Sequence, residues 1–234
     1  MGAPRPTALV VPRLTPLFCA TRLLVRGLLR LWVRFRVEGI GRYPAGPAVI
    51  VANHPSALDP MFIAAAVPDR VLFLAAREFL AWPLVGWAMR AYGCIPVRRG
   101  GVDTGAVRLA LRALAAGVKV GVFPEGRVSP TPGPLRPGAG MLAAVAGVPL
   151  LPVAVIGSGR AFPLGARYLR PARVIVKIGA TLPPPGAGGG GGRGQGREAP
   201  VGEAMAWVFA EAGGGVGVRR RWRHVLHELD GAPR

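Results

Sequence analysis

The sequence predicts an α/β fold, in which a single mixed, mostly parallel sheet is flanked by helices, and two observations indicate this class. Apolar, β-branched runs are typical of buried strands, and they span residues 48–52, 71–74, 118–123, 150–156 and 174–178. Helix-like stretches alternate with them, at residues 61–67, 79–92, 104–116 and 139–146. Such alternation favours one sheet with helices on its faces. At 234 residues the chain is long enough for one such domain with appendages.

The composition combines 51% hydrophobic residues with a formal charge of +19. This charge favours phosphate-bearing partners such as anionic lipid, acyl-CoA, acyl carrier protein or nucleic acid. Arginine supplies 28 of the 30 basic residues, a skew that nucleotide composition alone could produce. The charge is therefore not specific evidence for any one of these partners. Cys19 and Cys94 form neither a disulfide framework nor a Cys-x-x-Cys motif, which favours a reducing compartment. Prolines interrupt the N-terminal apolar stretch, so no secretory signal is expected.

An amphipathic helix is predicted over residues 21–36. Arginines recur there every four residues on one face, at Arg22, Arg26, Arg30 and Arg34. Large apolar side chains share the opposite face, namely Leu24, Leu28, Leu31, Trp32 and Phe35. The pattern is typical of a helix lying in a membrane interface. The alternative is that the apolar face packs on the protein and the arginines are solvated.

Four segments are expected along the chain. Residues 1–40 form a basic, membrane-associating segment and residues 41–182 form the α/β domain. Residues 183–200 are a linker, because eight of the eleven residues from 186 to 196 are glycine. Residues 201–234 form a helical tail.

A histidine and an aspartate follow the first predicted strand, in Asn53-His-Pro-Ser-Ala-Leu-Asp59. A histidine whose ring is held by a carboxylate can act as a general base. Ligands of open α/β sheets bind beyond the carboxyl ends of the strands, where this pair is expected. Simpler interpretations exist for both residues. Asp59, followed by Pro60, could be only a helix N-cap, and His54 could be a hydrogen-bonded core residue.

A second acidic turn follows another predicted strand, in Val120-Gly-Val-Phe-Pro-Glu-Gly126. We expect Glu125 to reach the same edge of the sheet as His54, because the carboxyl ends of parallel strands lie together.

These residues resemble the glycerolipid acyltransferases of the 1-acyl-glycerol-3-phosphate acyltransferase type, over roughly residues 37–182. Four blocks in the expected order carry the resemblance: Asn53-His-Pro-Ser-Ala-Leu-Asp59, Gly93-Cys-Ile-Pro-Val-Arg-Arg99, Phe123-Pro-Glu-Gly-Arg-Val-Ser129 and Val148-Pro-Leu-Leu-Pro-Val-Ala154. The first matches the family's His-x-x-x-x-Asp motif. The resemblance implies the glycerolipid acyltransferase fold and transfer of an acyl group from a thioester to a hydroxyl.

The resemblance also implies roles for the site. His54 would be the general base and Asp59 would orient its ring. Glu125 and Gly126 would form the acceptor site, and arginines would bind an anionic group; the candidates are Arg77, Arg98, Arg99 and Arg127. No cofactor and no metal is expected, since His224 and His227 fit an ordinary amphipathic helix.

The third block departs from the family pattern. Arg127 stands where the family usually has threonine and Val128 where it usually has arginine, so the phosphate-binding arginine is shifted or absent. The acceptor therefore stays open between a lysophospholipid such as 1-acyl-glycerol 3-phosphate, glycerol 3-phosphate and a lyso-aminolipid. The donor is acyl-CoA or acyl carrier protein.

Two rival functions are a basic nucleic-acid-binding protein and a non-catalytic membrane-binding relative. The first leaves Phe-Pro-Glu-Gly unexplained and has few aromatic residues among its basic ones, so no nucleic-acid partner is expected. The second does not fit the intact His54 and Asp59. The expected location is the cytoplasmic face of the cell membrane, as a peripheral or monotopic protein.

Overall fold

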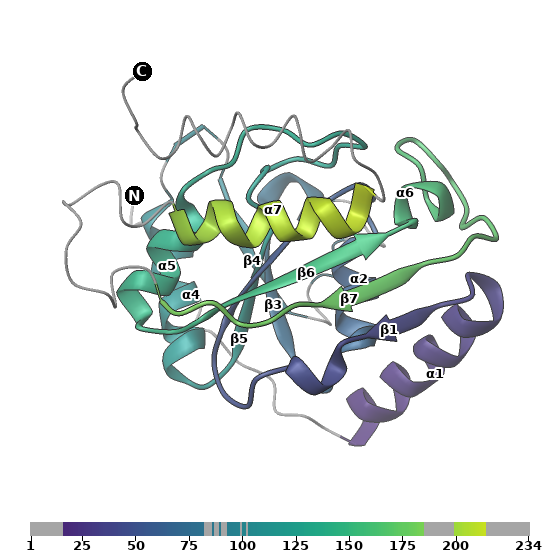
Figure 1. Ribbon diagram of the computed structural model, residues 1–234, viewed down its shortest axis with the longest axis horizontal. Helices are drawn as coiled ribbons and strands as arrows, with labels where there is room; N and C mark the ends of the chain where they lie inside the picture. The colour runs from purple at the N-terminus through teal and green to yellow at the C-terminus, as the bar shows by residue number, and fades with distance from the viewer. Residues whose placement is uncertain are drawn as a thin grey trace.

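The centre of the protein is a seven-stranded sheet with the strand order β1-β7-β6-β2-β5-β3-β4. The structure is a computed structural model, and it describes residues 16–81, 86, 89, 93–98, 100–101, 103–184 and 199–213. Neighbouring strands are parallel except β6 and β7, which are antiparallel. The predicted fold class, a mixed and mostly parallel sheet flanked by helices, is confirmed (Figure 1).

All five predicted strands are present among the seven. The strands are β1 Arg36–Glu38, β2 Val49–Ala52, β3 Val71–Ala76, β4 Cys94–Val97, β5 Lys119–Val122, β6 Leu150–Ile156 and β7 Ile175–Ile178. Sequence analysis missed β1 and β4. Two of the three residues of β1 are charged, and Pro96 in β4 is tolerated only because β4 lies at the edge of the sheet.

Helices cover both faces of this sheet. The α-helices are α1 Pro16–Trp32, α2 Asp59–Ala66, α4 Thr104–Ala115, α5 Gly138–Ala146, α6 Ser158–Ala161 and α7 Ala199–Gly213, and the 3₁₀ helices are η1 Ile40–Arg42 and η2 Arg77–Ala81. The predicted helices at 61–67, 104–116 and 139–146 agree with α2, α4 and α5. Most of the helix predicted at 79–92 lies outside the described residues.

The two faces of β2 belong to two separate hydrophobic clusters. Ile50 and Ala52 pack on one face with residues of α1 and α2. Val49 and Val51 point to the other face, where they pack with residues of α4, α5 and α7. Figure 1 shows α7 lying along β6, and its buried side chains there are Val201, Ala204, Met205, Val208 and Phe209. This helix therefore shares a core with the sheet, although it follows the glycine-rich segment.

Helix α1 presents its large apolar side chains to solvent. Leu24, Leu28 and Leu31 are 63%, 57% and 85% exposed. The opposite side of the helix faces the protein, where Arg22 donates a hydrogen bond to the carbonyl of Val67 and Leu29 is buried. The alternative in which the leucine face packs on the protein is therefore wrong.

The predicted helix also ends early, at Trp32 rather than residue 36. The chain then turns, and Phe35 enters the core, where its ring lies 6.1 Å from that of Phe62. None of the described helices is both long and apolar enough to cross a membrane.

Candidate active site

The loop after β2 holds His54 against Asp59. Nδ1 of His54 lies 2.9 Å from Oδ2 of Asp59, and the same oxygen accepts the backbone N–H of Ser56 at 2.7 Å. A carboxylate at Nδ1 favours the tautomer with its proton there, which leaves Nε2 as a hydrogen-bond acceptor. The His54 side chain is 15% exposed and that of Asp59 is fully buried. The loop therefore holds an oriented imidazole that substrate can reach from one side.

Asn53 ties the start of this loop to the neighbouring strand β6. Its amide donates to the carbonyl of Val155 at 2.9 Å and accepts the N–H of Val155 at 2.8 Å. Ser56 anchors the middle of the loop to the residue after α6, because its hydroxyl donates to the carbonyl of Phe162 at 3.0 Å. Sequence analysis quoted Asn53 and Ser56 in the first block without giving them roles.

The expectation that Asp59 could be an N-cap is wrong. Leu58 occupies the N-cap position of α2, without a side-chain hydrogen bond, and Asp59 is the first helical residue. Its carboxylate bonds His54 and Ser56 through Oδ2. Burial raises the pKa of Asp59, opposed by the side chains of His54 and Ser158 and by the N–H of Ser56.

The turn after β5 meets the same loop. The Phe123 ring stacks on the His54 ring, with centroids 3.9 Å apart and planes 14° apart. The N–H of Ser129 donates to the carbonyl of His54 at 2.8 Å. The two strand-end sites thus converge, as the sheet order requires of neighbouring parallel strands β2 and β5.

Glu125 is buried at this junction with an unsatisfied oxygen. The residue is 5% exposed, and Oε2 has no hydrogen-bond partner among the described residues. Burial raises the pKa of Glu125 to about 7; the Arg127 guanidinium lowers it and the Asp59 charge raises it further. A buried polar atom without a hydrogen-bond partner destabilises the folded state by about 1–3 kcal/mol. Such an atom is typical of a group that binds a ligand.

Two arginines flank the Glu125 turn. Arg127 is exposed, and its guanidinium approaches Gly133. Arg136, which sequence analysis missed, packs against Gly126: a Cβ at Gly126 would lie 2.8 Å from its Nε. The N–H of Arg136 donates to the carbonyl of Pro124 at 2.8 Å, which closes the loop. The chain thus brings a second guanidinium to the turn in which Val128 replaces an arginine.

The other predicted arginines are farther along the same edge. Arg77 is exposed and begins η2, directly after β3. Arg98 follows β4 at the end of the sheet, and its Nε lies 3.5 Å from a carboxylate oxygen of Asp103. Arg99 lies outside the described residues. Of the predicted arginines that the structure describes, Arg127 alone lies close to Glu125 in sequence and affects its pKa.

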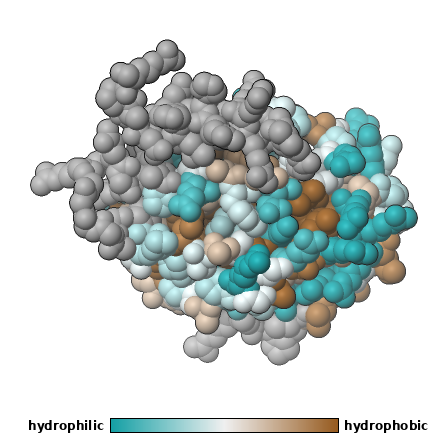
Figure 2. Space-filling view, in the orientation of Figure 1, coloured by the Kyte–Doolittle hydropathy of each residue, from teal (hydrophilic) through white to brown (hydrophobic). Residues whose placement is uncertain are grey.

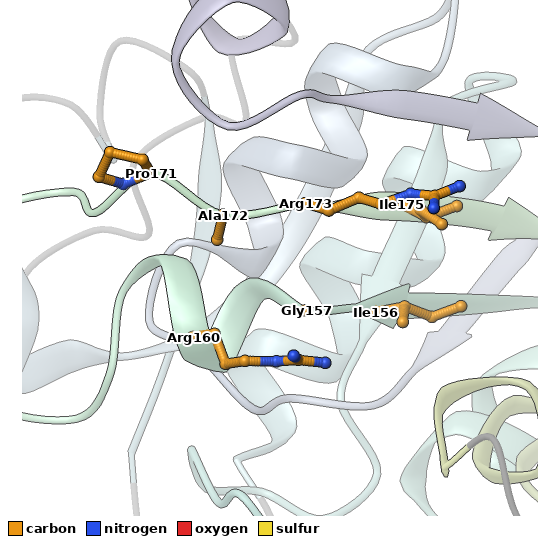
Figure 3. Close-up of a pocket in the computed structure, with 7 residues that line it drawn as sticks. All are labelled: Ile156, Gly157, Arg160, Pro171, Ala172, Arg173 and Ile175. Atoms are coloured by element: carbon orange, nitrogen blue, oxygen red, sulfur yellow. The ribbon is translucent and has the colours of Figure 1, made fainter.

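A cavity of about 480 Å³ opens near this site but is not lined by His54 (Figure 3). It lies at the end of β6, and its walls include Gly157 and Arg160. On the other side of α6, Gly159 approaches Pro55 and Ser158 influences Asp59. Helix α6 therefore separates the cavity from the histidine loop. Within the described residues, no group of three His, Cys, Asp or Glu side chains could hold a metal ion.

Known proteins resemble this chain in sequence and fold. Residues 34–156 match the family described as Acyltransferase. A chloroplastic 1-acyl-sn-glycerol-3-phosphate acyltransferase of Brassica napus is 30% identical over 138 residues, covering 56% of this chain and 39% of the relative. A lyso-ornithine lipid O-acyltransferase of Pseudomonas aeruginosa is 37% identical over 93 residues, covering 39% of this chain and 35% of the relative. The chain thus spans less than half of either relative.

A solved structure shares the fold. The crystal structure of the 1-acyl-sn-glycerophosphate (LPA) acyltransferase PlsC from Thermotoga maritima has a TM-score of 0.61 and 24% sequence identity. The likeness covers 94% of this chain and 86% of that one.

Proposed function

Because the chain belongs to the acyltransferase family, we propose that it transfers a fatty acyl group from an acyl thioester to the free hydroxyl of a lysophospholipid, with 1-acyl-glycerol 3-phosphate as the acceptor. The observation that carries this proposal is the contact of 2.9 Å between His54 Nδ1 and Asp59 Oδ2 at the strand edge that Glu125 shares. The donor is acyl-CoA or acyl carrier protein.

In the proposed mechanism His54 is the general base. Its Nε2 takes the proton of the acceptor hydroxyl while the hydroxyl oxygen attacks the thioester carbonyl. The tetrahedral intermediate collapses, the carbon–sulfur bond breaks, and the imidazolium returns the proton to the leaving thiolate. Asp59 keeps the ring in place and stabilises the imidazolium, and no acyl-enzyme forms.

The acceptor phosphate is assigned to the turn after β5. Arg127 and Arg136 supply guanidinium groups there, which bind phosphate through charge-assisted hydrogen bonds. Arg77 is a further candidate from the neighbouring strand end, and Arg98 and Arg99 remain candidates for an anionic group of the donor or acceptor. Glu125 is assigned to the acceptor site, since its buried oxygen without a partner lies at the turn that carries Arg127.

A second acceptor class is a lyso-aminolipid. Two observations favour it: the altered third block with Arg127 and Val128, and the likeness to a lyso-ornithine lipid O-acyltransferase.

We propose that the protein lies at the cytoplasmic face of the membrane as a peripheral or monotopic protein. The exposed leucines of α1 support the contact with a membrane, since an exposed apolar helix face beside arginines suits a lipid interface.

The test is acyl transfer from labelled acyl-CoA and acyl carrier protein to a panel of acceptors. The panel holds 1-acyl-glycerol 3-phosphate, glycerol 3-phosphate, a neutral lysophospholipid and a lyso-aminolipid. His54→Ala should lower turnover by about 10²–10⁴-fold, because a positioned general base contributes about that factor. Donor binding should be retained. Near-normal turnover in His54→Ala would remove His54 from the mechanism, and transfer to none of the acceptors would reject the proposed function.

A further inference from the structure

The chain between α6 and β7 forms a wall shared by two cavities. The first holds about 480 Å³ and the second about 470 Å³, and residues 171–173 line both. The first lies at the paired ends of β6 and β7, where Ile156 is opposite Ile175. The second reaches the end of α1. Both cavities therefore lie near the carboxyl end of β6, and no residue of the histidine loop lines them.

Three arginines line the cavities. Arg160 and Arg173 line the first, where Figure 3 shows their side chains extending in the same direction. Arg34 and Arg173 line the second. All three are exposed, and no carboxylate is among the described residues that line either cavity. Guanidinium groups around an open cavity without a carboxylate among its described lining favour a phosphate-bearing ligand.

Apolar side chains are exposed beside these arginines. Leu31 is 85% exposed and Trp32 is 57% exposed, and both line the second cavity. Leu164 and Tyr168, on the segment that leads to the shared wall, are 74% and 70% exposed. Figure 2 shows hydrophobic and hydrophilic residues side by side on the right of the molecule, where Figure 1 places α1 and this segment. A soluble phosphate compound needs no such apolar border, whereas a phospholipid does.

Fixed contacts hold the end of α1 against the wall. The indole N–H of Trp32 donates to the carbonyl of Leu169 at 3.0 Å. The N–H of Val174 donates to the carbonyl of Val33 at 3.1 Å. Directly after Trp32 and Val33, Arg34 has a φ of 44°, a left-handed conformation that is unfavourable for a side chain of its size. The surrounding bonds maintain this conformation, and they keep Arg34 beside the shared wall.

We propose that Arg34, Arg160 and Arg173 bind the phosphate headgroup of an anionic membrane phospholipid, whose apolar part lies over Leu31 and Trp32. This lipid is separate from the acceptor, because α6 stands between the cavity and Asp59. Its binding fixes how the protein sits on the bilayer, with the carboxyl edge of the sheet toward the lipids. The inference shares only the membrane location with the proposed function, and it is measured without acyl transfer.

The test is binding of the full chain to phosphatidylcholine vesicles with and without phosphatidylglycerol. The variant is Arg160→Gln with Arg173→Gln. The matched control is Arg108→Gln with Arg112→Gln, which removes the same charge from exposed positions of α4, on the opposite face of the sheet from α1. Thermal unfolding checks that both variants are folded.

An arginine near an anionic surface contributes about 1 kcal/mol, or about fivefold in affinity. The Arg160/Arg173 variant should therefore lose about 25-fold in affinity for phosphatidylglycerol vesicles, and the control should lose much less. Binding to pure phosphatidylcholine should be equal in all three proteins. An equal loss of vesicle affinity in both variants would show that only the net charge of the protein matters, and it would overturn the proposal.

A separate arm tests the donor as the source of the phosphate. If the Arg160/Arg173 variant binds vesicles normally but has a raised KM for acyl-CoA, these arginines bind the donor's phosphates and the headgroup site is rejected. Acyl transfer to a soluble short-chain acceptor should be unchanged in the variant. Loss of vesicle binding with that transfer intact separates this inference from the proposed reaction.

Discussion

Buried charged side chains occur at both edges of the sheet, but the two edges pair them differently. At the amino edge, Lys119 is 1% exposed and its Nζ lies 2.8 Å from a carboxylate oxygen of Asp69 and 4.5 Å from the Tyr43 ring centroid. At the carboxyl edge, Oε2 of Glu125 is buried without a hydrogen-bond partner among the residues that the structure describes. The first edge satisfies its charge within the protein and the second does not. An unsatisfied buried oxygen destabilises the fold, and its position beside the His54 loop supports the proposed acceptor site.

The comparison predicts that Asp59→Asn damages activity more than any other change considered below. Asparagine presents an N–H to His54 or loses the bond, so the ring no longer holds its proton on Nδ1. We expect kcat to fall by about 10³-fold or more. Steady-state kinetics with 1-acyl-glycerol 3-phosphate measures this. A variant with normal kcat would show that the orientation of the ring does not depend on this carboxylate.

At the amino edge the opposite outcome is expected. Asp69→Asn removes the carboxylate beside the buried ammonium of Lys119. Because Asp69 is itself 45% exposed, the expected loss is smaller than the roughly 3 kcal/mol of a fully buried pair. Urea unfolding should show this loss, while kcat/KM of the folded enzyme stays unchanged. If activity fell and stability did not, the division of roles between the two edges would be wrong.

Arg136→Gln tests whether the arginine at the Glu125 turn binds the acceptor. Loss of one charge-assisted contact at a partly exposed site should raise the acceptor KM by about tenfold, which corresponds to about 1.4 kcal/mol. A neutral lysophospholipid should show no such rise. Arg108→Gln on α4 is the control. An equal rise for charged and neutral acceptors would contradict phosphate recognition by Arg136.

The smallest effect is expected from the charge of Glu125. Its pKa of about 7 makes it neutral below that pH and ionised above it. The ionised carboxylate repels an acceptor phosphate, so the acceptor KM should rise by about fivefold through this range, as about 1 kcal/mol of repulsion predicts. Glu125→Gln should flatten this rise. Because the raised pKa favours the neutral form in the folded state, wild type should also lose unfolding free energy relative to the variant as pH rises from about 4.5 to about 7, with no further loss above that.

Most of this carboxyl edge could be predicted from the sequence because strand ends follow from apolar runs. The sheet, the approach of His54 to Asp59 and the convergence with Glu125 all depend on residues adjacent to such runs. Arg136 could not be predicted in the same way. It reaches Gly126 through a loop closed by its own hydrogen bond to Pro124, and no periodicity signals that closure.

The sequence also could not predict which side of α1 contacts the protein. Helical periodicity separates arginines from leucines but does not say which face packs. The contact from Arg22 to the carbonyl of Val67 decides it, together with the burial of Leu29. Strand β1 could not be recognised for a related reason. It has three residues and is defined by its pairing with β7, which is far away in the sequence.

The position of α7 has a consequence for how the chain folds. This helix follows all seven strands in the chain, yet it covers β6 and contacts β2. During synthesis, α4 and α5 can cover part of the apolar face of the central strands, but the part over β6 stays uncovered until residues 199–213 have emerged. That face is a site for misassociation in the interval, and the glycine-rich segment before α7 sets how quickly the helix can reach it.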